Sequence, residues 1–186
     1  MEWLIDRFKL AGDQAAFIHE GRRVSYDIVV ALIDDFYFQI KSVEIQRGDT
    51  VVVMGDYSPE VFCMIMALGR NGCIVIPLTR NSVVEESVAL SVSGCEWYVE
   101  FDASGRQPTI THRGIASDNK LLADFRKKDS PGIVLFSSGS TGKPKGILHD
   151  FNLVAQKFHK QRSPVVAIPV FPMRQKQQGN HEREWA

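Results

Sequence analysis

The sequence predicts an α/β protein built on an open, largely parallel sheet with flanking helices. Short apolar runs typical of buried strands occur at 51–54, 73–78, 96–101 and 132–136. Between them lie segments whose apolar residues recur at helical spacing. Strands that alternate with helices of this length favour parallel strands joined by helical crossovers, and therefore a sheet covered on both faces.

The chain is expected to open with a hairpin and two helices. Residues 16–18 pair with 23–24 across a turn at Glu20 and Gly21. Ser25 is placed to cap a helix whose apolar positions run to Ile40. After the strand at 51–54, the segment 58–60 combines a serine cap, a first-turn proline and an acid, which is typical of a helix start.

The second half continues the alternation up to a glycine-rich loop. A helix is expected at 82–93, then the strand at 96–101. Residues 102–131 are polar and predict a surface connection with a short helix near 121–126. After the loop, a helix is expected at 151–159 and a strand at 165–169, with Asp150 favoured as the helix cap over acid–base chemistry with His149.

The segment 137–146, SSGSTGKPKG, predicts a phosphate-cradling loop. Glycines let the backbone turn its N–H groups toward an anion, hydroxyls donate further hydrogen bonds, and lysines add positive charge. It differs from a Walker A loop, which has four residues between its glycines followed by Gly-Lys-Ser/Thr. The alternative is a flexible Gly/Ser surface loop with solvated lysines.

With Phe136 in front, this string (FSSGSTGKPKG) resembles the phosphate-binding signature of the adenylate-forming, or AMP-binding, enzymes. These comprise acyl-CoA synthetases, luciferases and the adenylation domains of peptide synthetases. The weaker resemblance of the surrounding chain covers about 15–160. It implies the incomplete N-terminal part of that family's large domain. The residues it places at the nucleotide are Ser137, Ser138, Gly139, Ser140, Thr141, Gly142, Lys143, Lys145 and Gly146.

Roles within this loop also follow from the resemblance. Contacts to the β- and γ-phosphates of ATP are implied for Ser138 to Gly142 and for Lys145, which is a candidate phosphate stabiliser. Lys143 occupies a variable position and is expected to be mainly solvated. Mg²⁺ would arrive with ATP, with Thr141 as its candidate protein contact, and no protein metal site is expected.

The implied activity is ATP-dependent carboxylate activation: an acyl-adenylate forms, and a thiol of CoA or a pantetheine carrier then takes the acyl group. The residues that choose the acid lie beyond this sequence in relatives, as do the C-terminal catalytic motifs. The chain is therefore expected to be weak or inactive alone. The alternative is a non-catalytic nucleotide-binding remnant, or a fragment that needs a partner carrying the missing half.

Composition excludes several other classes. Twenty-two basic and twenty-two acidic residues balance, so there is no electrostatic case for nucleic acid. No apolar run approaches the roughly 18 residues of a membrane helix. The three cysteines, Cys63, Cys73 and Cys95, fit reduced core thiols, which favours the cytoplasm.

The last residues depart from the pattern. Residues 1–169 are expected to form a partial adenylation domain, whereas 170–186 turn polar without alternation or helical period. Two explanations stay open for this change. Either translation leaves the ancestral reading frame near Pro169, or the segment is a genuine disordered tail.

Overall fold

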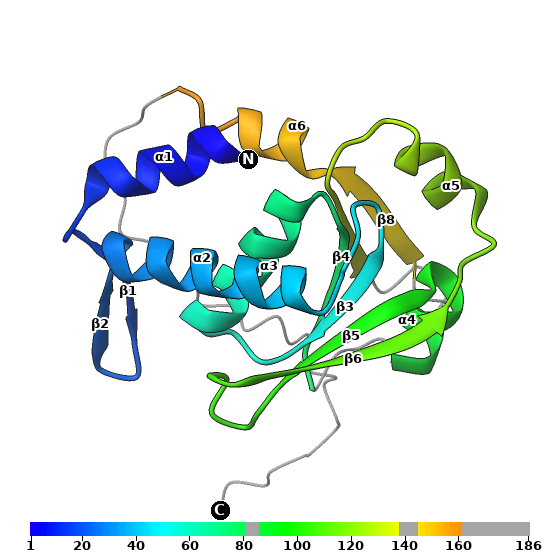
Figure 1. The fold of residues 1–186 in the computed structure, drawn as a ribbon, viewed down its shortest axis with the longest axis horizontal. Coiled ribbons are helices and arrows are strands. Elements are labelled where there is room, and N and C mark those ends of the chain that lie inside the picture. Colours follow the sequence, from blue (N-terminus) through cyan, green and yellow to red (C-terminus); the bar gives the residue numbers. More distant parts are fainter. Residues whose placement is uncertain (81–85, 138–144, 161–186) are drawn as a thin grey trace, which may run out of the picture.

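A computed structural model describes residues 1–80, 86–137 and 145–160 of the chain. They form a two-stranded hairpin and a six-stranded sheet (Figure 1). The order in the large sheet is β6-β5-β3-β4-β7-β8. Its strands are β3 (Thr50–Met54), β4 (Ile74–Leu78), β5 (Cys95–Phe101), β6 (Pro108–Ile115), β7 (Gly132–Ser137) and β8 (Lys145–Asp150).

The four inner strands are parallel, which confirms the expected fold class. β3 pairs in parallel with β4 and β5, and β4 with β7. The two outer strands, β6 and β8, are antiparallel to their neighbours. The two central strands, β3 and β4, are Val- and Ile-rich runs that are almost wholly buried on both faces, as is typical of parallel sheets.

Helices cover both faces of the sheet. One core joins Val51, Val53 and Val75 of the strands to the N-terminal helices and hairpin. The opposite core joins Val52 and Ile76 to the later helices. The elements of the first side are α1 (Glu2–Ala11), β1 (Ala15–His19), β2 (Arg22–Ser25), α2 (Tyr26–Ser42) and α3 (Pro59–Asn71), and those of the second are α4 (Glu86–Ser93) and α5 (Lys120–Arg126).

Three helix starts predicted from the sequence are confirmed. The Ser25 hydroxyl accepts from the Ile28 N–H at 3.4 Å, and the Ser58 hydroxyl accepts from the Val61 N–H at 3.1 Å. Asp150 caps α6 (Phe151–Gln156) by accepting from the N–H groups of the second and third helical residues. Each cap satisfies a donor that the first helical turn leaves without a partner.

Two strands were not expected. The stretch 102–131, predicted to be a surface connection, contains β6 as well as the anticipated short helix α5. The phosphate loop is followed by β8, and only then by α6, which ends at Gln156 rather than at 159. Both strands lie at sheet edges, where exposed side chains remove the apolar pattern that reveals an inner strand.

Other expectations fall partly outside the described residues. The helix predicted at 82–93 is described from Glu86 onward. The strand predicted at 165–169 and the tail 170–186 lie outside the described residues. Within the described ranges, no helix combines the length and the hydropathy that crossing a membrane requires.

The three cysteines are buried and free, as predicted. Burial raises the pKa of the Cys63 and Cys73 thiols to about 12 and that of Cys95 to about 11. They therefore stay protonated at neutral pH and serve as small apolar core residues.

Candidate functional site

The stem of the candidate phosphate loop lies at the carboxyl edge of the sheet. Ser137 is the last residue of β7 and Lys145 is the first residue of β8, and the two are direct register partners. The two strands that flank the loop therefore pair in register up to its stem, at the edge where α/β sheets commonly bind ligands. The loop residues Ser138, Gly139, Ser140, Thr141, Gly142 and Lys143 lie outside the described residues, and their roles stay predictions.

The stem residues differ in their accessibility and their neighbours. Ser137 and Lys145 are exposed, so their hydroxyl and ammonium groups are available to a ligand. Gly146 faces the other side of the hairpin. A Cβ added there would lie 3.1 Å from the Phe136 ring and 3.3 Å from Val134, so Gly146 has a packing reason to be glycine.

His149 and Asp150 lie at the far end of β8 from the loop. Asp150 pairs with Gly132, the first residue of β7, and accepts a hydrogen bond from the Ser130 hydroxyl at 2.8 Å. Asp150 lies five steps along β8 from Lys145, or roughly 17 Å at the usual rise per residue. The cap role predicted for Asp150 is confirmed, and the pair lies too far from Lys145 to act on the same phosphate.

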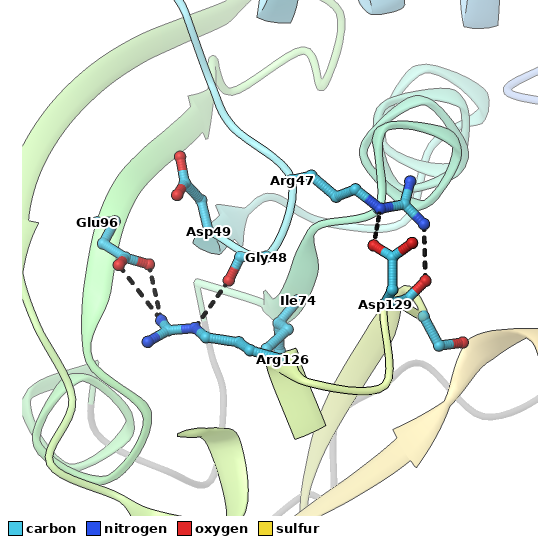
Figure 2. Close-up of a pocket in the computed structure, with 9 residues that line it drawn as sticks. Arg47, Gly48, Asp49, Ile74, Glu96, Arg126 and Asp129 are labelled. Carbon is cyan, nitrogen blue, oxygen red and sulfur yellow. Dashed lines mark hydrogen bonds and ion pairs between the residues drawn. The ribbon is translucent and has the colours of Figure 1, made fainter. Parts of the chain in front are cut away.

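A second site with charged side chains lies at the amino ends of β3 and β4, on the opposite edge of the sheet from the loop (Figure 2). This hollow of about 300 Å³ has two arginines in its wall, and both are engaged. Arg126 donates to Glu96 and to the Gly48 carbonyl, each at 3.0 Å, while Arg47 donates to the Asp129 carboxylate and carbonyl.

The hollow therefore offers no spare cation for a phosphate. Burial and the nearby Glu96 carboxylate raise the pKa of Asp49, and the hydrogen bonds that Asp49 accepts offset only part of this rise. Two of those come from the Gln46 N–H at 2.8 Å and the Trp97 indole N–H at 3.0 Å. The network ties the starts of β3 and β5 to α5 and the following turn, so its role is structural.

No metal site of protein ligands is found in the part of the chain that the structure describes. Among residues 1–80, 86–137 and 145–160, no three His, Cys, Asp or Glu side chains are grouped to hold an ion.

One residue of interest gave no signal in the sequence. Thr79 follows β4 directly, and its hydroxyl oxygen is buried without a hydrogen-bond partner among the described residues. A threonine at the end of an apolar strand is unremarkable in a sequence, because its burial and its missing partner depend on how the strand packs. Thr79 also lines a cavity of about 90 Å³ between α3 and the sheet.

The open sheet and the stem residues Ser137 and Lys145 at its carboxyl edge define an α/β protein whose loop sequence predicts a phosphate-binding site. The family model described as AMP-binding enzyme matches residues 6–172. The chain belongs to that family, as the resemblance of its loop predicted.

Its relatives include large synthetases and stand-alone ligases. A polyketide synthase-nonribosomal peptide synthetase, phmA, of Phaeosphaeria nodorum is 29% identical over 74% of this chain and 4% of its own length. A 2-succinylbenzoate–CoA ligase of Listeria monocytogenes is 20% identical over 91% of this chain and 39% of its own length. The chain thus spans less than half the length of these relatives.

Solved structures share the fold. The N-terminal subdomain of Klebsiella oxytoca NpsA, in complex with 3-hydroxyanthranilyl-AMSN, matches 78% of this chain and 39% of its own, with a TM-score of 0.56 and 22% identity. The o-succinylbenzoate CoA synthetase MenE of Bacillus subtilis, in complex with the acyl-adenylate OSB-AMP, matches 86% of this chain and 46% of its own, with a TM-score of 0.57 and 18% identity. Both share the α/β fold of this chain, and the first of them is itself an N-terminal subdomain.

Proposed function

We propose that this chain binds Mg-ATP and contributes to ATP-dependent activation of a carboxylic acid. The observation that carries the proposal is the pairing of exposed Ser137 with exposed Lys145 at the carboxyl edge of the sheet, on either side of the family's phosphate loop. Membership of the AMP-binding family supports the same activity.

In the proposed reaction, a carboxylate oxygen of the acid attacks the α-phosphorus of ATP. The bond from that phosphorus to the bridging oxygen of pyrophosphate breaks, and pyrophosphate leaves with the electron pair. The products are an acyl-adenylate and pyrophosphate. A thiolate of CoA or of a pantetheine carrier then attacks the acyl carbon, and AMP leaves to give a thioester.

The residues of the loop stabilise the leaving group in this proposal. Negative charge accumulates on pyrophosphate, so fixed donors and a cation beside it lower the barrier. Lys145 supplies the cation from the stem, and the loop supplies the donors Ser138, Gly139, Ser140, Thr141 and Gly142. Mg²⁺ bound with ATP would share the charge as a Lewis acid, with Thr141 as its protein contact.

A second candidate function is a non-catalytic nucleotide-binding fragment that needs a partner carrying the rest of the enzyme. It is favoured by the length of the relatives and by exposed apolar side chains on β7 and β8. Leu135 and Ile147, register partners on β7 and β8, are 41% and 48% exposed. We further propose a cytoplasmic location, a partial adenylation domain at 1–169 and a separate tail at 170–186.

A thermal melt with and without Mg-ATP tests the proposal, with Lys145→Ala as the variant and Lys41→Ala as the control. Both lysines are exposed, and Lys41 lies in the last turn of α2, which leads into the amino end of β3 at the opposite edge of the sheet from the loop. ATP should raise the melting temperature of the protein and of Lys41→Ala, and raise that of Lys145→Ala less. An equal rise in all three, or none in any, contradicts the proposed site.

Exchange of pyrophosphate into ATP, driven by a panel of acids, then separates the two candidate functions. Exchange shows adenylation by this chain alone. Binding of ATP without exchange favours the fragment that needs a partner.

A further inference from the structure

β6 forms an open edge of the six-stranded sheet (Figure 1). It runs over Pro108–Ile115, pairs with β5 on one side, and has no described strand on the other. Most of its residues are exposed. The backbone N–H and C=O groups on the free side of such a strand are a template on which a further strand can pair.

The backbone groups of β6 that face β5 follow from the hydrogen-bond ladder. The Asp102 N–H donates to the Gln107 carbonyl at 3.0 Å, so these two residues form a hydrogen-bonded pair just before the ladder. Antiparallel ladders alternate between hydrogen-bonded and non-hydrogen-bonded pairs. The register continues without a shift as far as His112, so the residues of β6 that bond to β5 are Thr109 and Thr111.

The residues at the alternate positions turn their backbone groups away from the sheet. These are Pro108, Ile110 and His112. Proline is confined to outward positions of this kind, because it has no N–H to give to a neighbouring strand, and the place of Pro108 agrees with the assignment. Ile110 and His112 therefore each present one N–H and one C=O group to the open edge.

The usual protections of an edge strand are missing between Thr109 and Arg113. Proteins guard free edges with lysine, proline, bulges or very short strands. In β6 the proline stands before this run, and the register irregularity with Gly114 at φ +63° comes after it. The guanidinium carbon of Arg113 lies 5.0 Å from the centre of the Tyr98 ring, so this charge is held back over the sheet. The run is a regular and unguarded strand edge.

This edge is complementary to itself in one antiparallel register. With Thr111 on a two-fold axis, Ile110 of each copy lies opposite the partner's His112, and each such pair exchanges both of its N–H···O=C bonds. A register shifted one way sets Pro108, which has no N–H, opposite the partner's His112. A register shifted the other way sets two His112 rings together. The centred register is therefore the one that pairs every outward group without a clash.

The side chains agree with the same register. Thr111 meets the partner's Thr111, and threonine pairs across strands stabilise sheets. Arg113 comes opposite the partner's Thr109, whose own neighbour on β5 is Glu100. No like charges therefore face each other across the axis, and the nearest opposite charges attract.

We propose that two copies of this chain associate through β6, edge to edge and antiparallel, so that their sheets become one continuous sheet. The contact is short, so the association is weak and depends on protein concentration. Since β6 and β8 are the opposite edges of the sheet, Lys145 on β8 stays accessible in the pair of copies. The inference does not depend on the proposed function.

Amide hydrogen exchange, followed by NMR on the purified chain at low and at high protein concentration, tests the mode of pairing. The N–H groups of Thr109 and Thr111 bond to β5 and should exchange slowly at both concentrations. Those of Ile110 and His112 should exchange quickly in dilute solution and slowly in concentrated solution. Exchange at Ile110 and His112 that does not respond to concentration overturns the inference.

Thr111→Lys is the decisive variant, and Thr111→Val is its matched control. Thr111 is exposed and belongs to neither core. The two introduced ammonium groups would oppose each other on the axis, so analytical ultracentrifugation should show self-association weakened about tenfold or more, and added salt should restore part of it. Thr111→Val keeps a β-branched side chain without charge and should associate like the unmodified chain.

The remaining outcomes decide against the inference. A chain that stays monomeric at every concentration overturns it, and leaves the edge to an extended segment of another protein. Self-association that Thr111→Lys does not weaken also overturns it, because the contact then lies on another surface. The rise in melting temperature with Mg-ATP is measured separately on Thr111→Lys and should match that of the unmodified chain, so a failure of the proposed function is not confused with a failure of the pairing.

Discussion

Ser58 makes two hydrogen bonds that join α3 to the β5–β6 loop, and its removal should be felt at both. Its hydroxyl accepts from the Val61 N–H at 3.1 Å and donates to the Gly105 carbonyl at 2.8 Å, in a side chain that is 3% exposed. Loss of a serine cap costs about 1 kcal/mol. The buried Gly105 carbonyl left without a donor adds about 1 kcal/mol. Ser58→Ala should therefore lower the free energy of unfolding by about 2 kcal/mol.

The assay is a thermal melt, with Ser25→Ala as the matched control. Ser25 also caps a helix, but through one hydrogen bond of 3.4 Å. For a chain of this size, 1 kcal/mol corresponds to about 2–4 °C. Ser58→Ala should melt about 4–8 °C lower and Ser25→Ala about 2–4 °C lower, while Ser58→Thr keeps the hydroxyl and recovers most of the loss. Equal shifts in the two alanine variants would refute the second bond as a source of stability.

Two further predictions concern the core and a helix end. Because burial raises the pKa values of the three thiols to about 11 to 12, the unfolded chain releases their protons first, above an ordinary value of 9. Stability should then fall between pH 9 and 11 by about 1.4 kcal/mol per pH unit for each thiol, and urea titrations should show a shallower fall for Cys73→Ala. Gly72 has φ +84° and an added Cβ would lie 2.7 Å from the Arg47 side chain, whereas Gly21, at φ +75°, has open space. Gly72→Ala should cost about 2 kcal/mol or more and Gly21→Ala about 1 kcal/mol in the same titrations, and equal costs would contradict the close approach.

Local signals in the sequence were sufficient for the inner sheet and the helix starts. Val51 to Val53 are apolar on both faces because helices cover both, and Ser25, Ser58 and Asp150 cap through bonds to residues two or three positions away. Both the apolar runs and the caps are formed by residues that are close together in the sequence, so they can be predicted from the sequence alone.

The edge strands could not be found in this way. β6 carries Thr, His, Arg and Gly in a mostly exposed strand, and β8 begins with Lys145 and Gly146 beside the loop. Each forms because it pairs with a distant partner, β5 or β7, and the pairing leaves no period in its own residues. The burial of the Thr79 hydroxyl was hidden for the same reason, since it follows from how the end of β4 packs beside α3.

The placement of Lys145 makes it a better probe of function than any buried residue of the sheet. Its side chain is exposed at the first position of an edge strand, and no described ion pair involves it. Substitution at such a surface position usually changes stability by less than about 0.5 kcal/mol. The two cores that hold the fold lie deeper, on either side of β3, β4 and β5. A loss of the ATP response in Lys145→Ala therefore reports on the phosphate site itself, because this substitution leaves both cores intact and a general loss of stability is not expected.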